Sequence, residues 1–209
     1  MVKKLFIFDF DGTLADSRMT LVKIANELAE EFGYDPVTED EIIRLSNLSS
    51  RDVFLQSPIP PYKIPFLLRR VKKELNQHVA NLKPFGGINE ALSNLKHQGF
   101  NLGIVTSNME NNVLEFLKNN KLEHYFDFVY SANTIFGKNR TINKLIKKHK
   151  LLIDKIVYVG DETRDIEAAK KSKIKVIAVT WGFNSAHVLN QYKPDFLIHQ
   201  PQQLSEIFK

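Results

Sequence analysis

Short apolar runs separated by longer amphipathic stretches dominate the pattern of hydrophobic and polar positions along this chain. Short runs without alternation are typical of strands that are buried on both faces of a sheet. The stretches between them carry apolar residues at helical spacing, and strands that alternate with helices predict an α/β fold with a doubly wound, Rossmann-like parallel sheet. The expected buried strands are Leu5–Phe8, Leu102–Val105, Ile156–Val159 and Val176–Val179, with Phe126–Tyr130 and Phe196–Ile198 as further short or edge strands.

Residues 16–83 interrupt this alternation, because they contain helical patterns and no convincing strand. Thr38 followed by Glu41 forms a capping-box sequence in front of one of these helices. We therefore expect an all-helical cap domain at 16–83, inserted into a Rossmann-like core domain made of 1–15 and 84–209, with hinges near the two junctions. The expected cap helices are Leu21–Phe32, Glu39–Leu45 and Ile64–Val79.

The composition narrows the expected environment and partners. The chain has 209 residues, no cysteine and a formal net charge of +5. The lack of cysteine excludes disulfides and thiolate catalysis, and with no signal peptide or membrane-length apolar run we expect a cytoplasmic protein. The mild positive charge suits small anionic ligands. The sequence has no cluster of basic residues interleaved with aromatic residues of the kind that would indicate binding to nucleic acid. We expect no membrane or nucleic-acid partner, and the sequence leaves the oligomeric state open.

Two carboxylates stand directly behind the first apolar run, in the stretch Asp9-Phe10-Asp11-Gly12-Thr13. Polar side chains just past a buried strand project into the crevice where open α/β sheets bind ligands. Gly12 permits a sharp turn there, and the Thr13 hydroxyl can hold that turn in place. The pair suits a nucleophilic carboxylate, an acid/base carboxylate beside it and a bound Mg²⁺ ion. An ordinary turn rich in Asp and Gly is the alternative interpretation.

Two more candidate sites lie at a strand end and at a helix start. Thr106-Ser107-Asn108 follows a strand and offers hydroxyl and backbone N–H groups to a phosphoryl oxygen, although these residue types are also ordinary helix N-caps. Lys138 opens a helix, where the macrodipole disfavours a cation, so an anion bound nearby would explain its presence. The alternative is a lysine that points into solvent.

A last acidic site is the stretch Gly160-Asp161-Glu162-Thr163-Arg164-Asp165, directly after a predicted strand. Asp161 is expected beside Asp9, where a hard cation takes oxygen ligands, and Asp165 lies one helical turn further on. A helix start with acids at its N-terminus is the alternative, and it explains only part of the set. Because the four sites follow strand ends, we expect them in one crevice that holds the groups required for phosphoryl transfer.

In this order, the four sites resemble the four motifs of the haloacid dehalogenase-like hydrolase superfamily. The resemblance covers essentially the whole chain, and the helical block at 16–83 resembles the small cap of that superfamily. The segments 179–184 and 193–196 are similar to members described as phosphoglycolate phosphatase-like. The resemblance therefore implies a Mg²⁺-dependent phosphatase with a Rossmann-like core and a cap.

The resemblance also implies a role for each motif residue. Asp9 would attack phosphorus and form an aspartyl-phosphate, and Asp11 would protonate the leaving alcohol and then deprotonate the attacking water. Mg²⁺ would be held by Asp9, the backbone carbonyl of Asp11, and Asp161. Such an anionic transition state among carboxylates needs a divalent cation and a lysine. The residues implied in phosphate binding are Thr106, Ser107, Asn108 and Lys138, with Thr13 and Asp165 in supporting roles, Asp165 at the metal or beside the lysine.

Arg51 is the one cap residue that we consider for a substrate carboxylate, because a guanidinium binds a carboxylate with two hydrogen bonds. The favoured alternative is a surface arginine paired with Asp52 or Glu41. Other basic residues of the cap are expected on a solvated helix face, and these are Arg69, Arg70, Lys72 and Lys73.

The leading functional hypothesis is hydrolysis of a small phosphorylated metabolite, with 2-phosphoglycolate as the first candidate. A phosphomutase would keep the same core residues and is the enzymatic alternative, since the two differ in how the cap excludes water. A binding module that kept the fold and lost activity is the alternative from a different class. By the resemblance, dehalogenases lack an acid at the position of Asp11, so dehalogenation is not expected.

Overall fold

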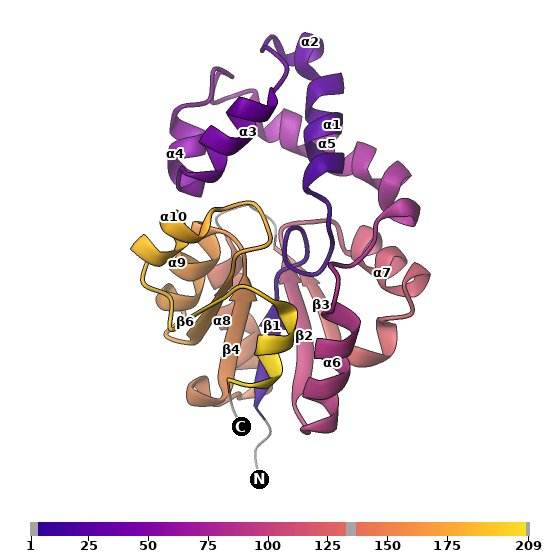
Figure 1. Cartoon of the computed structure of the whole chain (residues 1–209), viewed down its shortest axis with the longest axis vertical. Coiled ribbons are helices and arrows are strands. Elements are labelled where there is room, and N and C mark those ends of the chain that lie inside the picture. The colour runs from indigo at the N-terminus through magenta and orange to yellow at the C-terminus, as the bar shows by residue number, and fades with distance from the viewer. Residues whose placement is uncertain (1–3, 133–136, 208–209) are drawn as a thin grey trace.

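A six-stranded parallel sheet forms the centre of the computed structural model, which describes residues 4–132 and 137–207. Its strand order is β3-β2-β1-β4-β5-β6, the order of a doubly wound Rossmann-like sheet (Figure 1). The predicted fold class is confirmed, and a strand is present at each expected position. The strands are β1 (Leu5–Phe8), β2 (Asn101–Thr106), β3 (Phe128–Ser131), β4 (Ile156–Gly160), β5 (Lys175–Val179) and β6 (Phe196–Ile198).

β1 lies in the middle of the sheet, and its four apolar residues are all buried. Leu5 pairs with Asn101 of β2 and with Ile156 of β4, which sets the register on both sides. Alternate side chains of β1 join two core clusters: Phe6 packs with residues of α6 and α7, and Ile7 with residues of α8 and α9. The core helices are α6 (Ile88–His97), α7 (Glu110–Asn119), α8 (Lys138–His149), α9 (Thr163–Lys171) and α10 (Ala186–Gln191), with short 3-10 turns at Glu123–Tyr125, Ile153–Lys155 and Pro201–Ser205.

The cap, residues 16–83, forms a separate helical layer beyond the carboxyl ends of the strands (Figure 1). Thr38 caps α3 by accepting a hydrogen bond from Glu41 N, whereas the Glu41 carboxylate pairs with Arg44. α4 was not expected from the sequence, although Ser49 with Asp52 three residues later is an N-cap signal for it. The cap helices are α1 (Arg18–Glu27), α2 (Ala29–Phe32), α3 (Glu39–Ser46), α4 (Ser50–Leu55), α5 (Ile64–His78) and the 3-10 turn Val79–Asn81.

The chain enters and leaves the cap at two adjacent crossings. Ala15 and Pro84 form an antiparallel bridge, and Asp16 N donates a hydrogen bond to Lys83 O at 2.9 Å. Phe85 N donates to Leu14 O at 3.1 Å on the core side of that bridge. The crossings coincide with the predicted hinges, and the division into a core domain and a cap domain remains a prediction.

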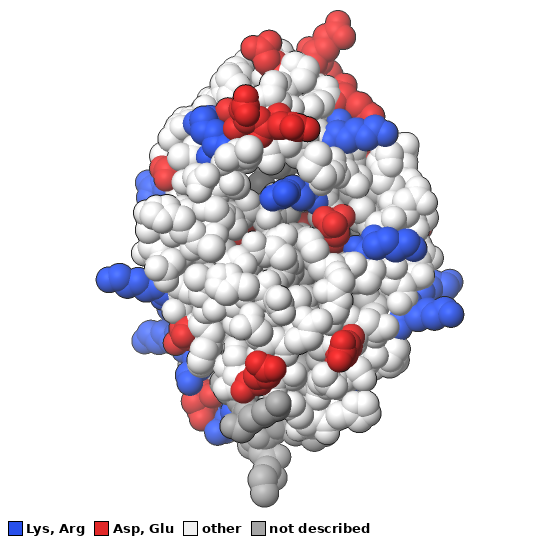
Figure 2. Space-filling model, viewed as in Figure 1, with Lys and Arg blue, Asp and Glu red and all other residues white. Residues whose placement is uncertain are grey.

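Charged side chains are unevenly distributed over the face in Figure 2, where acidic residues gather at the cap end. No helix among the described residues combines the length and the apolar character that crossing a membrane requires.

Candidate active site

The turn after β1 places the first two candidate carboxylates. Asp9 N still donates a hydrogen bond to Val159 O at 2.8 Å, so Asp9 extends the sheet by one residue before the chain turns. Gly12 then has a φ of +76°, and a Cβ there would lie 2.2 Å from Asp161 Oδ2. Thr13 Oγ1 donates to Asp161 Oδ1 at 2.7 Å. The turn therefore needs glycine for its backbone angle and for the close approach of Asp161.

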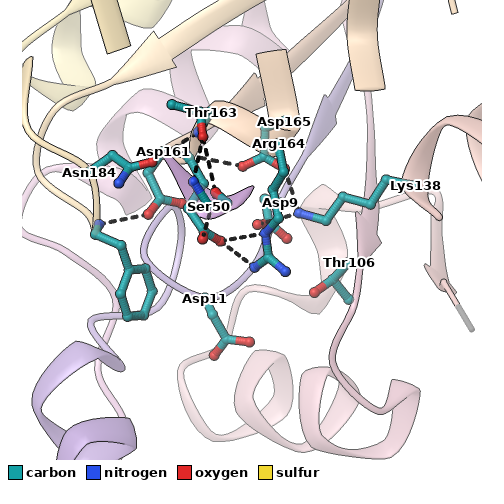
Figure 3. Close-up of polar contacts among 12 residues, drawn as sticks. Asp9, Asp11, Ser50, Thr106, Lys138, Asp161, Thr163, Arg164, Asp165 and Asn184 are labelled. Carbon is teal, nitrogen blue, oxygen red and sulfur yellow. Dashed lines mark hydrogen bonds and ion pairs between the residues drawn. The ribbon is translucent and has the colours of Figure 1, made fainter. Parts of the chain in front are cut away.

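Lys138 lies between two of the predicted site carboxylates. Its Nζ is 2.5 Å from Asp9 Oδ2 and 2.6 Å from Asp165 Oδ1, and all three side chains are at most 2% exposed (Figure 3). Burial alone would lower the pKa of Lys138, but Asp165 and Asp9 raise it above its ordinary value. The lysine is charged and buried, so the alternative of a solvent-directed side chain is wrong.

Asp9 has one carboxylate oxygen still available. Oδ2 binds Lys138, whereas Oδ1 is buried and has no hydrogen-bond partner among the described residues. Oxygen atoms of Asp9, Glu162 and Asp165 lie within 4.8 Å of one another. Buried carboxylate oxygens that converge in this way fit a hard divalent cation. The chemistry of the residues present is therefore compatible with the metal that the sequence predicted.

Asp161, the predicted metal ligand, is fully buried and held on both oxygens. In addition to Thr13, Phe183 N donates to its Oδ2 at 2.8 Å. Burial raises the pKa of Asp161 well above its ordinary value, and the charge of Glu162 adds to this effect. The set of converging oxygens thus includes Glu162, for which the sequence predicted no role, and Asp161 as a ligand remains a prediction.

Asp11 points away from the Lys138 group and is held from two sides (Figure 3). Ser17 Oγ donates to its Oδ1, and Asn108 Nδ2 donates to its Oδ2, each at 2.8 Å. Burial and the charge of Asp9 raise the pKa of Asp11 to about 6, although both hydrogen bonds lower it. A carboxyl group with this pKa can exchange a proton near neutral pH.

The predicted phosphate-binding segment follows β2 directly. Thr106 is buried, and its Oγ1 accepts a hydrogen bond from Asn108 N at 3.1 Å. Ser107 is half-buried. The Asn108 amide is committed to Asp11 and to neighbouring groups, so a direct contact between its side chain and a phosphate remains a prediction.

Cap residues reach the acidic site through backbone and hydroxyl groups. Ser50 N donates to Thr163 Oγ1 at 2.8 Å, and Ser50 Oγ donates to Glu162 Oε1 at 3.3 Å (Figure 3). Asn184 accepts from Thr163 N at 2.9 Å and donates to Leu48 O in the cap at 3.0 Å. The start of α4 is therefore docked on the loop that carries the acidic motif.

Two of the cap cations, Arg51 and Lys72, occupy different environments. Arg51 is exposed, and Asp52 and Glu41, its expected partners, accept hydrogen bonds from Ser49 and Arg44. Lys72 was expected on a solvated face, but it is half-buried because α5 turns it toward the core. Burial lowers the pKa of Lys72, as do Arg164 and Lys138, whereas Asp11 raises it.

Several residues of the site were missed at the sequence level. Ser17 lies six residues after Asp11 and Asn184 lies 21 residues after Thr163, and no local pattern identifies either of them as a site residue. Glu162 and Arg164 stand inside the acidic motif, where they form a half-buried ion pair. The sequence signal for Glu162 and Arg164 was the presence of four charged residues within the six-residue stretch 160–165. The N-terminus of an ordinary capped helix does not require so many charges.

Comparison with known proteins gives consistent matches over most of the chain. The family model described as "Haloacid dehalogenase-like hydrolase" matches residues 6–179. A phosphoglycolate phosphatase of Synechococcus elongatus is 38% identical over 95% of this chain and 93% of that protein. The pyrophosphatase PpaX of Bacillus cereus is 27% identical over 96% of this chain and 94% of that protein.

Solved structures show the same fold. A haloacid dehalogenase-like family hydrolase from Streptococcus pneumoniae superposes with a TM-score of 0.81 and 23% sequence identity. The match covers 99% of both chains, so it includes the cap as well as the sheet.

Proposed function

Because this chain belongs to the haloacid dehalogenase-like hydrolase family, we propose that it is a Mg²⁺-dependent phosphatase that acts through an aspartyl-phosphate. Its substrate is a small phosphate monoester, and 2-phosphoglycolate is the first candidate, supported by the name of the relative from Synechococcus elongatus. The proposal keeps the residue roles that the sequence suggested and assigns them to the contacts described above.

The state of Asp9 is the observation that carries this proposal. Lys138 binds Oδ2, while the buried Oδ1 is left without a partner among the described residues. A carboxylate oxygen that is desolvated and oriented in this way is a competent nucleophile toward phosphorus. Asp9 Oδ1 forms the bond to phosphorus as the bond to the leaving alcohol breaks.

Asp11 supplies and removes the protons of the reaction. Its raised pKa, about 6, allows a protonated carboxyl that donates to the leaving alkoxide. The resulting carboxylate then takes a proton from the water that attacks the aspartyl-phosphate. Ser17 and Asn108 donate hydrogen bonds to the two oxygens of Asp11, and these bonds define the orientation of its carboxyl group in this structure.

The metal would be held by Asp9, Asp161 and the backbone carbonyl of Asp11, with Glu162 and Asp165 as nearby oxygen donors. When bound, Mg²⁺ would offset negative charge on the phosphoryl group. Lys138 adds a second, permanent positive charge beside Asp9, and Thr106 offers a hydroxyl to the phosphoryl oxygens.

Lys72 is the better placed of the two cap cations for an anionic group of the substrate. It is half-buried and lies within electrostatic reach of Asp11, whereas Arg51 is exposed. An ammonium group within electrostatic reach of Asp11 would favour a monoester that carries a carboxylate, such as 2-phosphoglycolate.

The proposal is tested by phosphate release from a panel of substrates with and without Mg²⁺. The panel contains 2-phosphoglycolate, other alkyl monoesters, inorganic pyrophosphate and a sugar phosphate, and Asp9→Asn is the control variant. We expect Mg²⁺-dependent release from a monoester and a loss on the order of a thousandfold or more in Asp9→Asn. Isomer formation without release would indicate the phosphomutase, and no turnover of any compound would contradict the proposal.

A further inference from the structure

Three asparagines connect the cap to the catalytic carboxyl group. Asn76 of α5 donates its amide to Asn112 Oδ1 at 2.8 Å. Asn112 of α7 donates to Asn108 Oδ1 at 3.0 Å, and Asn108 donates to Asp11 Oδ2 at 2.8 Å. The series therefore runs from a cap helix, through a core helix, to Asp11.

Fixed backbone groups determine the direction of each amide in this series. Asn112 Nδ2 also donates to Lys72 O at 3.2 Å, and a carbonyl can only accept. Met109 N donates to Asn108 Oδ1 at 2.7 Å, so the Nδ2 of that amide must face Asp11. Neither amide can rotate by 180° without placing like groups against each other.

Asn112 depends on the cap for much of its hydrogen bonding. It is fully buried, and two of its three partners, Asn76 and the Lys72 carbonyl, belong to α5. A buried amide that loses such partners must rearrange or remain unsatisfied, and either outcome is unfavourable. Its remaining partner is Asn108, the residue that orients Asp11.

We propose that Asn112 is a positioning residue that makes the orientation of the Asp11 carboxylate depend on the docking of cap helix α5. This inference rests on the proposed function, in which Asp11 transfers protons. With α5 docked, Asn112 orients Asn108, which holds Asp11 Oδ2 toward the leaving group. With α5 displaced, the Asn108 amide keeps the hydrogen bond from Met109 N but loses the firm support of Asn112, so proton transfer is fastest when the cap covers the substrate.

The second support of Asp11 is also connected to the cap. Ser17, which binds Asp11 Oδ1, lies at the chain crossing where residues 16 and 83 are hydrogen-bonded. Ser17 therefore connects the other oxygen of Asp11 directly to the junction between the core and residues 16–83.

Asn76→Ala tests the inference without disturbing the core, because Asn76 is exposed, and Gln77→Ala on the same exposed helix turn is the matched control. In Asn76→Ala we expect kcat for 2-phosphoglycolate to fall about three- to tenfold, a loss that corresponds to one net hydrogen bond. KM should stay within about twofold of its value in the unaltered protein. Asn76→Gln, which keeps an amide donor, is expected to recover most of the lost rate.

The leaving group separates a proton-transfer role from a general loss of activity. p-Nitrophenolate departs without much help from an acid, so the initial burst from p-nitrophenyl phosphate should change less than about twofold in Asn76→Ala. Equal losses with both substrates, a change confined to KM, or an unchanged kcat would each overturn the inference.

An NMR measurement distinguishes failure of this inference from failure of the proposed function. The side-chain amide signals of Asn108 are expected to shift in Asn76→Ala and in Asn112→Asp, and to stay unchanged in Gln77→Ala. This readout needs no substrate. Unshifted Asn108 signals in Asn76→Ala would overturn the coupling, whatever reaction the protein catalyses.

Discussion

Lys138 carries a positive charge inside the protein, where transfer of an ammonium group from water is costly. Two carboxylates, Asp9 and Asp165, compensate for that cost at 2.5 and 2.6 Å. Removing one member of such a buried charged group destabilises a protein more than replacing the whole group by apolar residues, because the remaining charges lose their partner. Tertiary contacts therefore explain why Lys138 stands at the start of α8, where the helix dipole disfavours a positive charge.

Lys138→Met should destabilise the protein by about 3–5 kcal/mol near pH 8, since two carboxylates would be left buried without a cation. The cost in unfolding free energy should be smaller at pH 5. Burial raises the pKa of Asp165 to about 6 even with the lysine present, and removal of the lysine raises this pKa further. Protonation then removes the uncompensated charge. Urea unfolding at both pH values measures this difference.

Lys144→Met is the matched control, because Lys144 is exposed on the same helix. Its effect should stay within about 0.5 kcal/mol at both pH values. An equal cost for Lys138→Met at pH 5 and pH 8 would argue against ionised carboxylates around the lysine.

At the level of elements, two loops meet around Asp161. The turn after β1 approaches with Gly12, and the loop after β5 approaches with Gly182, where a Cβ would also lie 2.2 Å from Asp161 Oδ2. Side chains at either position would push this carboxylate out of place. The two glycines therefore make room for the site rather than simply allowing the chain to turn.

Gly12→Ala and Gly33→Ala separate these two effects. Both glycines have nearly the same backbone angle, φ +76° and +75°, but nothing lies within 4 Å of a Cβ at Gly33. Gly33→Ala should cost about 1 kcal/mol from backbone strain alone, and Gly12→Ala about 2–5 kcal/mol. Thermal unfolding of both variants provides the comparison, and equal costs would show that Asp161 yields without penalty.

The sequence was sufficient for the strands and for the order of the motif sites, because buried parallel strands are continuous apolar runs and their carboxyl ends share one edge. It was insufficient for α4, whose only signal is the short cap Ser49 and Asp52. Asn184 and Ser17 were not predictable, because no local pattern shows that the amide of Asn184 binds Thr163 N or that the hydroxyl of Ser17 turns back to Asp11. Lys72 was assigned to the wrong environment because helical periodicity does not reveal which other element the face of α5 that carries Lys72 packs against.

On the scale of the whole molecule, the charge of the site opposes that of the protein. The chain carries a net charge of +5, yet among the described residues five carboxylates of the site outnumber its cations, Lys138, Arg164 and the nearby Lys72. Burial and mutual repulsion raise the pKa of Asp11 and of Asp165 to about 6. Without a metal ion, ionisation of this cluster therefore works against folding.

The metal-free protein should become less stable as the pH rises from about 4 to 7. Both carboxyl groups have a pKa that folding raises from its ordinary value of 3.8 to about 6. Their favourable contribution is complete below the unfolded value and is lost as the pH rises through the folded value. The loss is at most about 3 kcal/mol for each group, from about 1.4 kcal/mol per pKa unit.

Melting curves in EDTA and in Mg²⁺ over this pH range test the prediction. Mg²⁺ should raise the melting temperature more at pH 7 than at pH 4.5, because only ionised carboxylates bind it well. Asp165→Asn should show a weaker pH dependence in EDTA. Stability that rises with pH through this window in EDTA would contradict the raised pKa values.

Because the two chain crossings at Ala15 and Pro84 are adjacent, residues 16–83 could be replaced as one segment. Because the two chain segments are already hydrogen-bonded to each other at Asp16 and Lys83, excision would leave ends that a short turn can join. A cap from a relative could be grafted at the same two points without altering the path of the sheet. Substrate preference could thus be changed by recombination at this one junction, provided that the new cap supplies groups that replace the contacts of Ser17 with Asp11 and of Asn76 with Asn112.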